Sequence, residues 1–127
     1  MSYLYNVRTV GTIVHVELGP SFVISLGHLL PLWGEVLVIC RDQRCHRVLV
    51  EGLNPPRDMG TLEAFKHGDF LGGLDQPGLR IAFCLYEYAS DEITQHFRAI
   101  ANAGSCDVMF FKDIDVALAW LAETGTA

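Results

Sequence analysis

The stretch from Asp107 to Leu121 constrains the fold of this chain more than any other. Its first part, Val108 to Phe111, is an unbroken apolar run, as expected of a β-strand covered on both faces. Asp113 can then cap the first free N–H groups of a helix. Four apolar residues follow at helical spacing, namely Ile114, Ala117, Leu118 and Leu121. Because a strand covered on both faces needs helices above and below the sheet, this stretch predicts a layered α/β domain.

The amino-terminal residues predict an antiparallel hairpin. Thr12 to Leu18 alternates apolar and polar side chains, as expected of a strand with one buried face. Tyr3 to Val10 is rich in aromatic and β-branched residues, and Gly11 between the two runs suits a turn. The free edge of such a hairpin offers a place for a second copy of the chain. A homodimer is therefore one expectation for its assembly, and a self-associating structural protein is one alternative for its function.

The stretch from Phe22 to Cys40 fits either a strand or a helix. Its β-branched residues favour a strand, whereas Pro31 suits the first turn of a helix. Apolar residues also recur near the helical period, at Leu30, Trp33, Leu37 and Cys40. Because a crossover to a parallel strand needs about a dozen residues, we predict a helix in two pieces, broken near Gly27 to Pro31.

The middle of the chain predicts two strands with a short helix between them. The strands are Arg47 to Val50 and Ile81 to Tyr86, and the second is the most apolar of the chain. Asp58 or Thr61 starts the helix, which carries Leu62 and Phe65 and ends at Gly68. Residues 69–78 are rich in Gly, Asp and Pro, so we predict a partly packed surface loop there.

A further helix is predicted between the last two strands. Ser90 is a good N-cap and Gly104 a good end, and the apolar stripe between them is Ile93, Phe97, Ile100 and Ala101. The order of elements is then β-β-α-β-α-β-α-β-α. It predicts an α/β fold of one domain over residues 1–127: a mixed sheet with an N-terminal antiparallel hairpin followed by parallel β-α units, with helices packed on the sheet.

The composition limits the classes of partner and location. Nine Lys and Arg against fifteen Asp and Glu give a net charge of −6, and without a basic block we expect no nucleic-acid partner. The most apolar stretch, Phe22 to Cys40, is interrupted by Gly, Pro and Glu, so no membrane span is predicted. The irregularly spaced cysteines and an amino terminus unlike a signal peptide predict free thiols in the cytoplasm.

No spacing of reactive residues identifies a reaction. Cys40, Cys45 and His46 are of the types that zinc prefers, but no second pair follows, so we predict no metal site and no cofactor. The glycines before the strand at Ile81 are not followed by a helix, which excludes a phosphate-binding loop. One enzymatic alternative is a small cysteine-dependent enzyme or redox protein that uses Cys84 or Cys106.

Ligands of parallel sheets bind beside the loops at the carboxyl ends of the strands. The residues of these loops that we assign to a regulatory or recognition site are Asp58, Met59, Gly60, Thr61, Ser90 and Asp113. Several of them also suit plain helix caps, which is the simpler use of such residues. Four apolar residues are candidates for an adjoining cleft: Phe70, Leu74, Tyr86 and Tyr88.

The last third of the chain resembles the STAS domain, in particular the small SpoIIAA-like, STAS/SEC14-type bacterial proteins. The likeness is carried by Leu79 to Phe83 and by Val108 to Leu121, a strand, a short acidic turn and an Ala-Leu-Ala-Trp-Leu helix. In anti-sigma-factor antagonists of this fold, a partner kinase phosphorylates a serine at the position that Met59 occupies here. Thr61 is the nearest hydroxyl. The resemblance implies a non-enzymatic binding or regulatory module that acts through a protein partner or a small apolar ligand.

Overall fold

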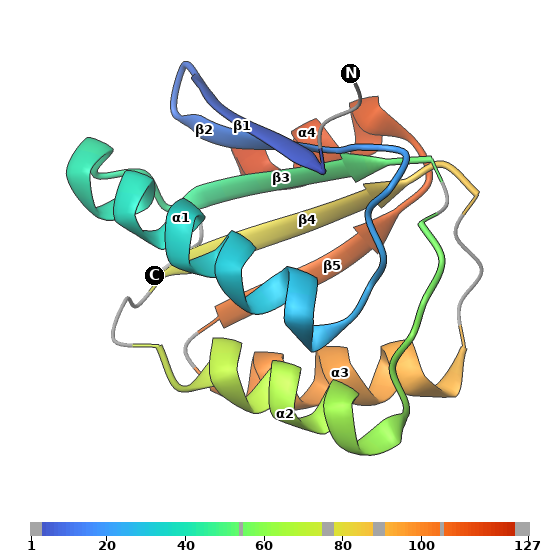
Figure 1. Cartoon of the computed structure of the whole chain (residues 1–127). Helices are drawn as coiled ribbons and strands as arrows, with labels where there is room; N and C mark the ends of the chain where they lie inside the picture. Colours follow the sequence, from blue (N-terminus) through green and yellow to red (C-terminus); the bar gives the residue numbers. More distant parts are fainter. Residues whose placement is uncertain (1–3, 54, 75–77, 88–90, 105, 124–127) are drawn as a thin grey trace.

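A computed structural model describes residues 4–53, 55–74, 78–87, 91–104 and 106–123 (Figure 1). They form one five-stranded sheet in which the strands lie side by side in sequence order, from β1 to β5. The strands are β1 Tyr5–Val10, β2 Ile13–Leu18, β3 Arg47–Gly52, β4 Leu79–Leu85 and β5 Cys106–Phe111. β1 and β2 are antiparallel, and the other neighbours are parallel, which confirms the predicted mixed sheet.

The turn of the hairpin depends on glycine. Gly11 has a φ of +61°, a left-handed conformation that residues with a Cβ rarely adopt. On β2, Val14 and Val16 are fully buried, while His15 on the other face remains partly accessible. The predicted hairpin and its buried face are therefore confirmed, although Tyr3 lies outside the described residues.

Helices cover both faces of the sheet. They are α1 Leu26–Gln43, α2 Thr61–Gly72, α3 Glu92–Ala103 and α4 Ile114–Ala122. Alternation along the strands supplies two cores: Val48 and Val50 of β3 belong to the larger core with α1, α2 and α3, whereas Leu49 belongs to a smaller one with α4. Figure 1 shows α4 on the side of the sheet opposite to α1. The domain therefore has three layers.

Helix α1 is one continuous helix, and the predicted break near Gly27 to Pro31 is wrong. Pro31 lies inside it, where the missing N–H costs about 3 kcal/mol in a helix interior. Six residues of α1 are nevertheless buried, namely Leu29, Leu32, Trp33, Val36, Leu37 and Cys40. Each such side chain contributes roughly 1.5–3 kcal/mol, so packing outweighs the proline. Leu30, predicted to be in the core, is 41% exposed.

Helix α2 is longer than predicted, because residues 69–72 are helical and not part of a loop. Leu71 is fully buried and draws this last turn onto the core, whereas Leu62 and Phe65 point outward. Gly68 does not end the helix. A Cβ there would lie 2.8 Å from the carbonyl oxygen of Phe97, so this glycine allows α2 and α3 to pack closely.

The caps of α2 and α3 differ from the prediction. The N-cap of α2 is Gly60, whose N–H donates to the Glu63 carboxylate at 3.2 Å, rather than Asp58 or Thr61. The N-cap of α3 is Asp91, which accepts from the Thr94 N–H at 2.8 Å. Ser90, the predicted cap, lies outside the described residues.

The order of strand, turn and helix at the end of the chain is confirmed, but β5 is an edge strand in which Met109, Phe110 and Phe111 are only partly buried, not a strand covered on both faces as predicted. Asp113 Oδ1 accepts from the N–H groups of Asp115 and Val116, at 2.8 and 3.2 Å. In α4 the buried residues are Ala117 and Leu121, while Leu118 is 38% exposed and does not belong to the core stripe as predicted. Helix α4 is the helix that packs on this face of the sheet, and it buries fewer side chains than the four that the helical spacing predicts.

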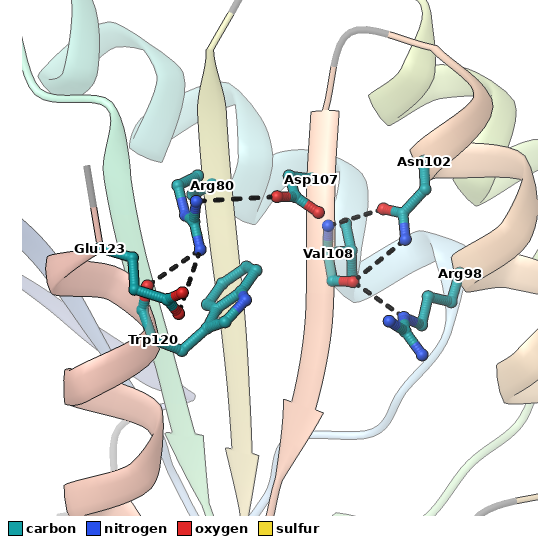
Figure 2. Close-up of polar contacts among 7 residues, drawn as sticks. All are labelled: Arg80, Arg98, Asn102, Asp107, Val108, Trp120 and Glu123. Carbon is teal, nitrogen blue, oxygen red and sulfur yellow. Dashed lines mark hydrogen bonds and ion pairs between the residues drawn. The ribbon is translucent and has the colours of Figure 1, made fainter. Parts of the chain in front are cut away.

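Arg80 of β4 holds the end of α4 against the sheet (Figure 2). Its guanidinium lies 4.1 Å from the ring centroid of Trp120 and donates to the Trp120 carbonyl at 2.9 Å. The carboxylates of Asp107 and Glu123 lie at 3.9 and 4.0 Å from it. A cation at the carboxyl end of a helix is favourable, so Arg80 combines stacking with this stabilisation.

The two edges of the sheet are treated differently. On β5, Val108 donates to the Asn102 side chain at 2.7 Å, and its carbonyl accepts from Asn102 and Arg98 of α3 (Figure 2). Helix α3 therefore occupies hydrogen-bonding groups that another strand would need. Among the described strands β1 pairs only with β2, so its outer edge is open.

None of the described helices combines the length and apolar character that crossing a membrane requires.

We predict that Arg80→Ala lowers the free energy of unfolding by about 2 kcal/mol, because it removes the cation–π contact and the hydrogen bond to α4. Arg47→Ala is the matched control, since Arg47 is the register neighbour of Arg80 and has only a 3.4 Å hydrogen bond to Thr12. It should change stability by less than about 0.5 kcal/mol. Urea unfolding measures both, and equal losses would show that Arg80 has no special role.

Candidate functional site

A cavity of about 540 Å³ lies in the larger core, where the parallel strands end. The strand residues that line it are Leu18, Val50, Phe83, Leu85 and Phe110. The helices and the segment before α1 add Phe22, Ile24, Leu29, Ala64, His67, Ile93, Thr94 and Phe97. The wall is therefore mostly apolar, and the cavity occupies the edge of the sheet where α/β proteins commonly bind ligands.

A segment before α2 covers one side of this cavity. Pro55, Pro56, Arg57 and Met59 of this segment line it. The Ile24 N–H donates to the Pro56 carbonyl at 2.8 Å, and the Asp58 N–H donates to the Ile24 carbonyl at 2.9 Å. These bonds fix the segment, residues 55–59, beside the start of α1. We name it the strap.

The accessible rim of the cavity is charged. Arg57 Nη1 of the strap lies 2.5 Å from Asp91 Oδ2, and these side chains are 34% and 41% exposed. Burial alone would raise the pKa of Asp91, but the Thr94 N–H and the Arg57 guanidinium hold it below its usual value. The ion pair joins the strap to the N-cap of α3, and Glu87 is a further charged residue that lines the cavity.

His67 is the buried polar side chain in the wall, whereas Thr94 in the same wall is partly accessible. His67 is 4% exposed, and its Nε2 accepts the Trp33 indole N–H at 2.8 Å. The Phe97 ring stacks on the imidazole at 4.3 Å between centroids, with 7° between the planes. Burial lowers the pKa of His67 to about 3, so the imidazole is neutral at ordinary pH.

A second polar cluster lies on the opposite face of the sheet. The Tyr86 hydroxyl donates to one carboxylate oxygen of Glu51, and the other oxygen lies 2.7 Å from His15 Nε2. The hydrogen bond to Glu51 raises the pKa of Tyr86. Tyr86 follows Cys84 by two residues and so shares the α4 face with it, because side chains alternate along a strand.

The four cysteines are free and buried. Burial raises the pKa of Cys40 to about 11 and that of Cys106 to about 12, and it also raises the pKa of Cys84. The cysteine-dependent alternative needs an accessible thiolate, which these surroundings disfavour. Within the described part of the chain, no three His, Cys, Asp or Glu side chains gather as metal ligands.

The predicted recognition residues are only partly brought together. Met59 lines the cavity, while Asp58 is exposed beside it in the strap. Gly60 and Thr61 follow at the start of α2, and Thr61 is exposed. Asp113 caps α4 on the other side of the sheet, away from the strap. Ser90 lies outside the described residues.

The residues predicted for an apolar cleft do not line this cavity where the structure describes them. Phe70 is 38% exposed on α2, Leu74 packs on the core, and neither lines the cavity. Tyr86 donates to Glu51 in the cluster on the opposite face, and Tyr88 lies outside the described residues. The residues missed were His67 and the core aromatic residues Phe83, Phe97 and Phe110. The one feature of the sequence that pointed to this wall is that His67 falls at helical spacing from Ala64 and Leu71, and so on the same face of α2.

Comparisons with protein-family models, with curated proteins and with solved structures found no match to this chain.

We predict that His67 makes stability fall in acid. Below about pH 6.5 the unfolded chain protonates this histidine, whereas the folded protein keeps it neutral down to about pH 3. The unfolded state therefore binds more protons in this window, and His67 costs up to about 1.4 kcal/mol per pH unit as the pH falls. Urea unfolding at several pH values should show the loss.

The control is Trp33→Phe/His67→Phe, which removes both buried polar groups and keeps two aromatic rings. The difference in unfolding free energy between wild type and this variant should decrease steadily from pH 6.5 to pH 3. A difference that is constant with pH would mean that His67 is not buried and neutral.

Proposed function

We propose that this protein is a non-enzymatic, STAS-like binding module that takes a small apolar ligand in the cavity under the strap. The observation that carries the proposal is the cavity itself, about 540 Å³ in volume and lined mainly by apolar side chains. Pockets for small molecules commonly have 300–1,000 Å³, an apolar interior and a few polar groups.

The STAS-like assignment has separate support. The element order begins with a hairpin and continues through parallel β-α units, and the chain ends with the strand, acidic turn and helix that carry the resemblance. The phosphorylated serine of anti-sigma-factor antagonists is replaced by Met59, which lines the cavity. In our proposal Met59, at the position of the phosphorylated serine, therefore contacts the ligand. Thr61, two residues further along the chain, carries an exposed hydroxyl.

A small ligand is better supported than a protein partner. The apolar area at the carboxyl ends of the strands is hollowed, and the strap lines one side of it, which suits a small molecule better than a flat protein surface. A protein partner would instead contact the exposed residues Asp58 and Thr61, which follow Arg57 at the rim. The two functions are compatible: in a regulatory module, the bound ligand would set the position of the strap, and a protein partner would bind the strap in that position. We place this action in the cytoplasm, where free thiols stay reduced.

We predict that N-phenyl-1-naphthylamine, a neutral apolar fluorophore, binds the wild-type protein with one-to-one stoichiometry and a blue-shifted, enhanced emission. Ala64→Leu should weaken this binding at least ten-fold, because Ala64 lines the cavity and a larger side chain fills it. The matched control is Ala119→Leu, the same change at an exposed position of α4. It should leave the affinity unchanged.

Fluorescence titration measures the affinities, and circular dichroism shows that each variant is folded. Equal weakening by both substitutions, or unsaturable binding by the wild type, would contradict the proposed site.

A further inference from the structure

We infer that the cavity selects an uncharged, mainly apolar ligand carrying one hydrogen-bond acceptor, and that the Nδ1–H group of His67 donates to this acceptor. The inference rests on the proposed function and names the chemical class of its ligand. Carbonyl oxygens of ketones, esters and amides belong to this class, whereas hydrocarbons and carboxylates do not.

The tautomer of His67 follows from its partner. The indole nitrogen of Trp33 is a donor only, so the hydrogen bond of 2.8 Å requires His67 Nε2 to be the acceptor. A neutral imidazole has a single N–H group, which must then be at Nδ1. His67 therefore presents a fixed donor whose orientation is set by the contact between α1 and α2.

This donor has no partner among the residues that the structure describes. The described hydrogen bonds of His67 include the one from Trp33 and none from Nδ1. Among the described side chains, the fully buried nitrogen that lacks a hydrogen-bond partner is Arg80 Nε. His67 Nδ1 lacks a partner as well but does not belong to this class, so it is not fully buried and keeps some accessible surface. His67 lines the cavity and is otherwise enclosed by Trp33 and Phe97, so this surface faces the cavity.

The surroundings favour a neutral acceptor. His67 is 4% exposed and stays uncharged at ordinary pH, so it supplies no positive charge to offset the desolvation of a carboxylate. Arg57 is the cation among the lining residues, and it is already paired with Asp91 at the rim. A buried donor left without an acceptor is unfavourable. A ligand that carries an acceptor should therefore bind more tightly than a hydrocarbon of the same shape.

The test compares two neutral probes of nearly equal shape, 2-acetylnaphthalene and 2-isopropenylnaphthalene, which differ by a carbonyl oxygen in place of a methylene group. Their dissociation constants are measured for the wild type and for Trp33→Phe/His67→Phe. The ratio of ketone affinity to hydrocarbon affinity should be about five-fold or more higher in the wild type, as one net hydrogen bond of about 1 kcal/mol requires. Taking this ratio cancels the difference in aqueous solvation of the probes.

A ratio that is the same in both proteins would overturn the inference and leave the proposed function intact. Failure of both probes to bind the folded wild type would instead overturn the proposed function, and the inference with it. Tighter binding of 2-naphthoate than of 2-acetylnaphthalene would also overturn the inference, because it would mean that the cavity prefers a charged ligand.

A second measurement needs no substitution. In protein with ¹⁵N-labelled histidine, the Nδ1 proton of His67 should move downfield when 2-acetylnaphthalene is added and not when 2-isopropenylnaphthalene is added. Equal responses to the two probes would contradict a hydrogen bond from His67.

Discussion

The hydrogen bond from Trp33 to His67 joins the two helices that form one wall of the cavity. Both side chains are almost fully buried, and each satisfies the polar group of the other at 2.8 Å. An unpaired buried donor or acceptor would cost roughly 1–3 kcal/mol, so the pair fixes how α1 sits against α2. Phe97 of α3 stacks on the same imidazole. One neutral histidine therefore connects three helices and also provides a buried polar atom of the candidate site.

The cavity is a consequence of how the helices cover the sheet. Gly68 in the second half of α2 and Gly104 at the C-cap of α3 have no side chains and let the backbones approach closely. Their first turns instead contribute Ala64, Ile93 and Thr94 to the cavity wall. The strap is joined to α3 by the pair of Arg57 and Asp91 and lines one side of the space that remains. The fold thus has a mostly apolar space, lined in part by the strap, where its parallel strands end.

Much of the fold could be predicted from sequence because periodicity reports local structure. The hairpin at Gly11 and the strand, cap and helix around Asp113 are set by residues close in the chain. The continuity of α1 across Pro31 and the length of α2 depend on burial against distant elements, which periodicity does not report. The site was missed for the same reason: Trp33 and His67 are 34 residues apart, and each alone resembles an ordinary core residue.

A two-dimensional NMR titration with N-phenyl-1-naphthylamine tests most directly whether the cavity is a ligand site. The account predicts saturable shifts for amides around the cavity, including those of Met59, His67 and Phe97, with little change in α4. Shifts confined to α4 or to the open edge of β1, or no saturable shifts at all, would contradict it.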